Sequence, residues 1–71
     1  MDRMKIVGER LRTARGDRQR SEIAEKAGIS LSAIQMYEDG KRMPRDTVKI
    51  RLSKVLGVGI ADLFYPEFFS E

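Results

Sequence analysis

Apolar residues recur along this chain at intervals of three and four, the spacing that places them on one face of an α-helix. They fall into five groups separated by short polar or glycine-containing breaks. The groups predict helices over residues 3–15, 18–27, 31–39, about 44–56 and about 60–64. No window alternates apolar and polar residues for long enough to indicate a strand. The pattern therefore predicts one compact all-α, five-helix domain over residues 1–71.

Capping residues and glycines predict where the helices begin and end. Asp17 can cap the second helix and Ser30 the third, because their side-chain oxygens accept hydrogen bonds from free backbone N–H groups. Gly28 and Gly40 are expected to end these two helices. Pro44 fits the first turn of the fourth helix, where a missing N–H costs nothing.

Residues 20–39 have the spacing of a helix-turn-helix. Ala24 is small enough to let a second helix approach, Gly28 permits a positive φ in the turn, and Ile34 is an apolar residue directed at the first helix. The other apolar positions of the pattern are filled by Ile23, Ala27, Ile29 and Tyr37. The complete set is far more specific than a lone Ala-x-x-x-Gly.

Composition narrows the chemistry that the chain can perform. The 71 residues include no cysteine and no histidine, which rules out disulfides, Cys/His metal sites and histidine-based acid–base catalysis. No phosphate-binding loop is present, and no apolar run approaches the roughly 20 residues that a membrane span needs. We therefore expect a non-enzymatic, cytoplasmic domain without cofactor, metal or membrane contact.

The net charge of +3 and the sequence pI of about 9.6 are compatible with an anionic partner. The distribution of the cations is more informative than their sum. They concentrate in two clusters, Arg10, Arg12, Arg15, Arg18 and Arg20 in one and Lys41, Arg42 and Arg45 in the other. Two solvated charged faces are the alternative interpretation.

Four segments together resemble one known family. They are "GERLRTAR", "SEIAEKAGIS", "LSAIQMYEDGKRMP" and "LSKVLGVGIADLF". In this order they resemble the helices and turns of the lambda-repressor-like family of DNA-binding regulators (Cro/CI, Xre-type). The chain departs from that family at Gln19 and Arg20, where Ser or Thr followed by Gln is usual, and at Lys49, which is usually apolar.

The resemblance implies which residues of the third helix approach DNA bases. Gln35 can pair with adenine, Ser32 can donate or accept, and the apolar side chains can contact thymine methyls. The implied base contacts are Leu31, Ser32, Gln35 and Met36. They predict A·T-rich half-sites with a contribution from DNA shape. The alternative is an exposed helix face with incidental apolar residues.

The resemblance also implies contacts with the phosphate backbone and one internal ion pair. An arginine late in the first helix pairs with a glutamate that ends the third helix, which here predicts Arg15 with Glu38 and leaves Arg12 as the alternative partner. The pair would hold its guanidinium near the DNA backbone. The implied phosphate contacts are Arg20, Lys41, Arg42, Arg45 and Arg15.

The C-terminal tail, residues 65–71, has an unusual composition. Most aromatic residues of the chain lie in or next to it: Phe64, Tyr65, Phe68 and Phe69. They predict either a flap over the chain's own core or a contact between two copies, since aromatic residues are enriched at interfaces. The residues alone leave both interpretations open.

These observations predict a sequence-specific regulator that binds double-stranded DNA. The expected mode is a homodimeric repressor on a twofold operator, with residues 31–39 in the major groove of each half-site. A protein-binding adaptor on the same fold, such as an antitoxin with a small protein partner, is the alternative.

Overall fold

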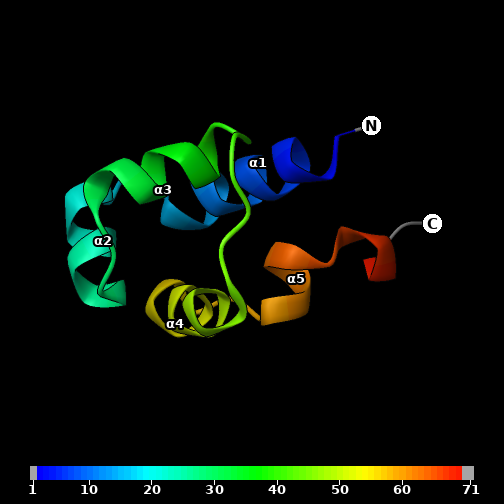
Figure 1. Cartoon of the computed structure of the whole chain (residues 1–71). Helices are drawn as coiled ribbons and strands as arrows, with labels where there is room; N and C mark the ends of the chain where they lie inside the picture. The colour runs from blue at the N-terminus through cyan, green and yellow to red at the C-terminus, as the bar shows by residue number, and fades with distance from the viewer. Residues whose placement is uncertain (1, 70–71) are drawn as a thin grey trace.

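The computed structural model describes residues 2–69, with side chains through Glu67. It confirms the all-α class, with five α-helices and one short 3-10 helix in this part of the chain (Figure 1). The elements are α1 (Arg3–Arg15), α2 (Arg20–Ala27), α3 (Leu31–Glu38), α4 (Asp46–Leu56), α5 (Ile60–Phe64) and η1 (Pro66–Phe69). Among these residues no helix is long and apolar enough to cross a membrane.

The helices surround one hydrophobic core. α3 packs on both α1 and α2, α4 lies against α2, and α5 contacts α1 and α4, so that α4 and α5 face α1 and α3 across the core (Figure 1). The buried residues come from every helix, and the largest that are fully enclosed are Phe64, Leu11, Ile23, Leu52, Leu63 and Val7. The core therefore fixes the orientation of α3, whose outer face carries the expected base contacts.

The predicted helix-turn-helix is formed by α2 and α3. Ser30 caps α3 as expected, because its Oγ accepts a hydrogen bond from the N–H of Ala33 at 3.0 Å. Gly28 ends α2 with a φ of +70°, a conformation that glycine adopts without steric cost. Ala24 and Ile34 are buried where the two helices meet the core.

The expected cap at Asp17 is wrong, because α2 begins at Arg20 with Gln19 in the N-cap position. Residues 16–19 instead complete the end of α1. The Arg18 side chain turns back and donates to the carbonyl oxygens of Ala14 at 2.9 Å and Arg15 at 3.2 Å. Carbonyls that end a helix need such donors.

The expected place of Pro44 in the first turn of α4 is also wrong. Pro44 is buried in the connection before the helix, Arg45 is the N-cap, and α4 begins at Asp46. A proline disfavours helical backbone at the residue before it, which favours the non-helical backbone of Met43. The carboxylate of Asp46 suits the positive end of the helix.

The start of the C-terminal tail is folded onto the domain. Phe64 is fully buried, which makes its expected role in a dimer contact wrong. Lys49 Nζ lies 4.8 Å from the centroid of the Tyr65 ring, and the Arg3 guanidinium lies 5.3 Å from it. Arg3 also donates to the Phe64 carbonyl oxygen at 3.0 Å. The side chains of Phe68 and Phe69 lie outside the described residues.

Gly8 sets the distance between α1 and α3. A Cβ at this position would overlap the backbone of α3, lying 2.8 Å from the carbonyl oxygen of Tyr37 and closer still to that of Glu38. Backbone atoms cannot turn aside as a flexible side chain can. A residue without a side chain is therefore required for this approach.

Replacing Gly8 with alanine is expected to destabilise the protein by about 1–3 kcal/mol, because the overlap outweighs the roughly 1 kcal/mol that alanine gains over glycine in a helix. Urea denaturation measures the change. Thr13→Ala, at an exposed position of α1, is the control and should be neutral or slightly stabilising. A stabilised Gly8→Ala protein would contradict the close approach.

Candidate nucleic-acid interface

The outer face of α3 carries the four side chains expected to contact bases. Leu31 has 45% of its surface exposed, Ser32 and Gln35 are exposed, and Met36 is partly buried. Positions 31, 32, 35 and 36 share one side of a helix because they are separated by one, four and five residues. Ile34 and Tyr37 occupy the opposite side and are buried. The structure thus presents the four side chains together on one surface.

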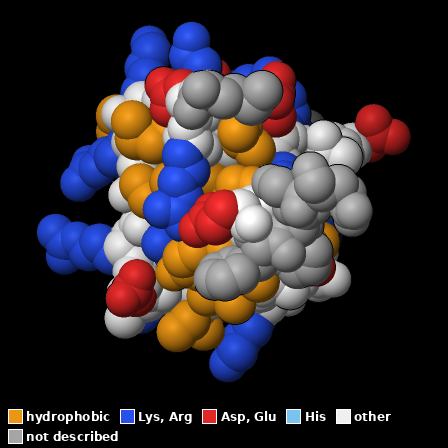
Figure 2. Space-filling model, turned by 90° about the vertical axis from the view of Figure 1, so that its right-hand side faces the viewer, with side chains coloured by type: hydrophobic (Ala, Val, Ile, Leu, Met, Phe, Trp, Pro, Cys, Tyr) orange, Lys and Arg blue, Asp and Glu red, His pale blue; other side chains and the backbone are white. Residues whose placement is uncertain are grey.

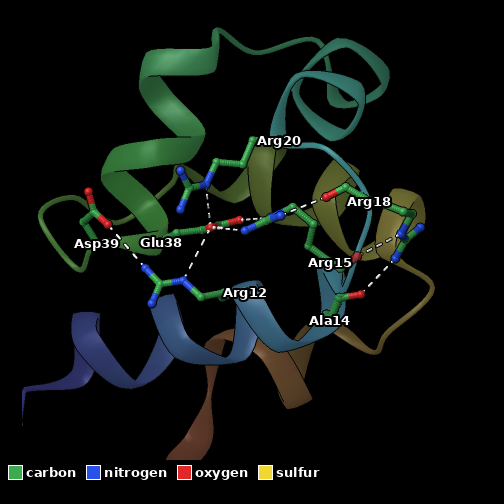
Figure 3. A network of polar contacts seen from close by, with 7 residues as sticks. All are labelled: Arg12, Ala14, Arg15, Arg18, Arg20, Glu38 and Asp39. Carbon is green, nitrogen blue, oxygen red and sulfur yellow. Dashed lines mark hydrogen bonds and ion pairs between the residues drawn. The ribbon is translucent and has the colours of Figure 1, made fainter.

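At the end of α3, the buried carboxylate of Glu38 forms ion pairs with three arginines (Figure 3). Arg15 makes a two-point contact with Glu38, Nε to Oε2 at 2.7 Å and Nη2 to Oε1 at 2.9 Å. Arg20 Nε donates to Oε1 at 3.0 Å, and Arg12 Nε lies 3.8 Å from the same oxygen. These contacts join α1, α2 and α3 at one point.

The network shifts the acidity of its members. Burial would raise the pKa of Glu38, but the hydrogen bonds from Arg15 and Arg20 and their positive charges outweigh burial, so this pKa lies below its usual value. The hydrogen bond to Glu38 outweighs burial at Arg15 as well and raises its pKa. Both groups therefore stay charged, as a buried pair must to retain its attraction.

The structure brings Arg15 and Glu38 together, and each of the three side-chain nitrogens of Arg15 donates a hydrogen bond within the protein. Its side chain is 14% exposed, and its remaining terminal nitrogen, Nη1, donates to the carbonyl oxygen of Arg18 at 2.8 Å. We therefore assign Arg15 a positioning role and leave it out of the proposed phosphate contacts. Arg12, the alternative partner, joins the outer side of the same network and also reaches Asp39 at 3.4 Å.

Arg20 differs from Arg15 because its side chain is 36% exposed. It lines a shallow notch at the start of α2, together with Ser21 and Gln35. Sequence reasoning placed Arg20 near a phosphate but missed its bond to Glu38. The separation of 18 residues gives no local signal for that contact.

The second basic cluster lies just after α3. Lys41, Arg42 and Arg45 are exposed on the connection to α4. Gly40 starts this connection with a φ of +71°, and a Cβ there would lie 2.8 Å from Cγ of Lys5. Two of the cations, Arg42 and Arg45, line a groove together with Ala33 and Tyr37 of α3.

This arrangement defines a helix-turn-helix DNA-binding domain, in which one exposed helix is held on a scaffold and flanked by cations. Comparison with protein families agrees, since a helix-turn-helix family model matches residues 9–63. The chain belongs to this family, of the Xre/Cro/CI type, which is a DNA-binding and not a catalytic family. A search of curated proteins finds no match.

Glu38→Gln is expected to destabilise the protein by about 3 kcal/mol at pH 7, because it leaves the largely buried Arg15 and the partly buried Arg20 without their counter-charge. The pKa of Glu38 is lower in the folded than in the unfolded chain. Its stabilisation is therefore complete above the pKa that Glu38 has in the unfolded chain and is lost as the pH falls through the lower folded-state pKa. In Glu38→Gln, the free energy of unfolding should therefore no longer fall over the pH range in which Glu38 is protonated.

Urea denaturation at pH 7 and at acidic pH measures both effects. Asp39→Asn is the matched control, since it removes a neighbouring carboxylate whose pair with Arg12 is about half exposed. It should cost no more than about 1 kcal/mol. Equal losses of stability in the two variants would show that the buried ion pairs of Glu38 stabilise the protein no more than an exposed pair does.

Proposed function

We propose that this protein is a sequence-specific transcriptional regulator that places α3 in the major groove of double-stranded DNA. The observation that carries the proposal is the outer face of α3, where Leu31, Ser32 and Gln35 are exposed and Met36 is partly exposed. The family supports DNA binding in general. The width of the major groove, about 12 Å, admits one α-helix.

The side chains on this face suggest which bases are read. The Gln35 amide can donate to N7 and accept from N6 of one adenine, a two-point contact that no other base offers in the same way. Leu31 and Met36 can pack against thymine methyl groups. We therefore propose A·T-rich half-sites, with DNA shape adding to the preference.

Phosphate contacts would fix the position of the helix in the groove. We assign them to Arg20 on one side of α3 and to Lys41, Arg42 and Arg45 after its end. Such contacts supply affinity and register, because phosphates are the same at every base pair. Arg15 and Glu38 would hold the scaffold from which these side chains project.

We further propose that two copies bind a twofold operator and that the bound dimer represses transcription by occupying the DNA. Half-sites about 34 Å apart would let both α3 helices enter the same side of the duplex. The contact between copies is proposed near α5 and the tail, where hydrophobic side chains gather on the face that bears the chain ends (Figure 2). Among the aromatic residues predicted to make this contact, Tyr65 is partly exposed and Phe64 is buried.

Selection of binding sites from a randomised duplex pool tests base reading. The expected result is a twofold sequence with A·T-rich half-sites, and G-rich half-sites would contradict the proposal. On the selected duplex, Gln35→Ala should weaken binding by about 5- to 150-fold and relax preference at one base, as loss of a bidentate contact predicts. Lys54→Gln, at an exposed position of α4 outside the groove beside α3, should bind nearly as the wild type does.

The mass of the complex with the selected duplex tests the dimer. Sedimentation should give two chains per duplex, and halving the site to one half-site should weaken binding because the second copy is lost. One chain per complete operator would remove the twofold mode while leaving base reading by α3 intact.

A further inference from the structure

The arginines of this protein divide into two groups by what they contact. Within residues 2–69, which contain all nine arginines, six donate hydrogen bonds to other groups of the protein. The six are Arg3, Arg10, Arg12, Arg15, Arg18 and Arg20. In that part of the chain, Arg42, Arg45 and Arg51 form neither a side-chain hydrogen bond nor an ion pair, and all three are exposed.

The three unpaired arginines line the same groove between α3 and α4. Its floor is apolar and is made by side chains that pack on the edge of the core. They are Ile29, Ala33, Met43 and Val48. Of the described residues that line this groove, none is acidic, so no carboxylate of the lining neutralises the charge of its rim.

Arg51 extends this groove to the beginning of α3. It lies on α4, and its Nη1 is 3.6 Å from the position that a Cβ on Gly28 would occupy. Gly28 belongs to the turn just before α3, whereas Arg42 and Arg45 belong to the connection just after α3. The three guanidinium groups therefore accompany α3 from its preceding turn to its following connection.

We propose that this groove receives the sugar-phosphate backbone of one DNA strand and that Arg51 is one of its phosphate contacts. The inference rests on the proposed function, since it requires α3 to enter the major groove. A backbone strand borders that groove, is anionic, and presents apolar deoxyribose surfaces that suit the floor. Arginine donates in a fork that matches phosphate oxygens.

The test compares two single substitutions on α4 that remove the same charge. Arg51→Gln removes the proposed contact, and Lys54→Gln removes an exposed cation that does not line the groove. Binding of the selected duplex is measured by fluorescence anisotropy between about 0.05 and 0.2 M salt. Urea denaturation of both variants confirms that each is folded.

Arg51→Gln should weaken binding about five- to tenfold near 0.1 M salt and reduce the salt slope by about one, as loss of one phosphate contact predicts. The preferred base sequence should stay the same. Lys54→Gln should change affinity less than about twofold. Equal effects of the two variants would overturn the inference, because net charge alone would then explain both.

The outcomes separate this inference from the proposed function. Wild-type protein without sequence preference would contradict the proposed function itself. Sequence-specific wild-type binding with an unaffected Arg51→Gln variant would overturn the Arg51 contact alone. An acidic peptide with apolar side chains, titrated in parallel, tests whether the groove binds a protein segment instead of DNA. If it binds wild type but not Arg51→Gln, while DNA binding is unchanged, the groove serves a protein and the inference is wrong.

Discussion

The structure depends on the pairing of Glu38. A carboxylate with 1% of its side chain exposed is costly to bury unless opposite charges and hydrogen bonds replace its water. Arg15 supplies two such bonds and Arg20 a third, from two different helices. Because Glu38 is the last residue of α3, the ion pairs hold the end of that helix against both α1 and α2. The absence of a side chain at Gly8 allows the backbones to approach closely enough for this to happen.

The same network decides which cations remain for a partner. The arginines of α1 and of the following turn donate hydrogen bonds to groups of the protein itself. The acceptors are Glu38, carbonyl oxygens near helix ends, and the C-terminal segment, and these bonds stabilise the scaffold. The arginines after α3 and on α4 have no such acceptor in the described part of the chain. The two basic clusters look equivalent in the sequence but differ in what they contact. The arginines of the first cluster mainly stabilise the fold, although Arg20 is also partly exposed. The cations of the second cluster, after α3, are exposed to solvent.

The sequence predicted the features that local physics controls and missed those that depend on packing. Helical spacing and the Ser30 cap gave α3 within one residue, since both are set by neighbours along the chain. Asp17 and Pro44 were sound local signals, but Arg18 and the buried connection determined the real helix ends. Arg20 and Arg51 acquire their surroundings from helices distant in sequence. Helical periodicity predicts which side of its helix such a residue occupies. It does not predict which residues of other helices that side contacts.

Lys49 illustrates how a departure from a family pattern can be accommodated. Its position is usually apolar, and its side chain is only 10% exposed, so that an unpartnered ammonium group would be costly there. The aromatic rings of Phe64 and Tyr65 lie 5.8 and 4.8 Å from Nζ, and the Tyr65 hydroxyl lies 3.3 Å away. Ring faces attract cations, and this attraction grows when water is excluded. The aromatic residues at the start of the tail therefore compensate the buried lysine, which gives them a structural role independent of any contact between two copies.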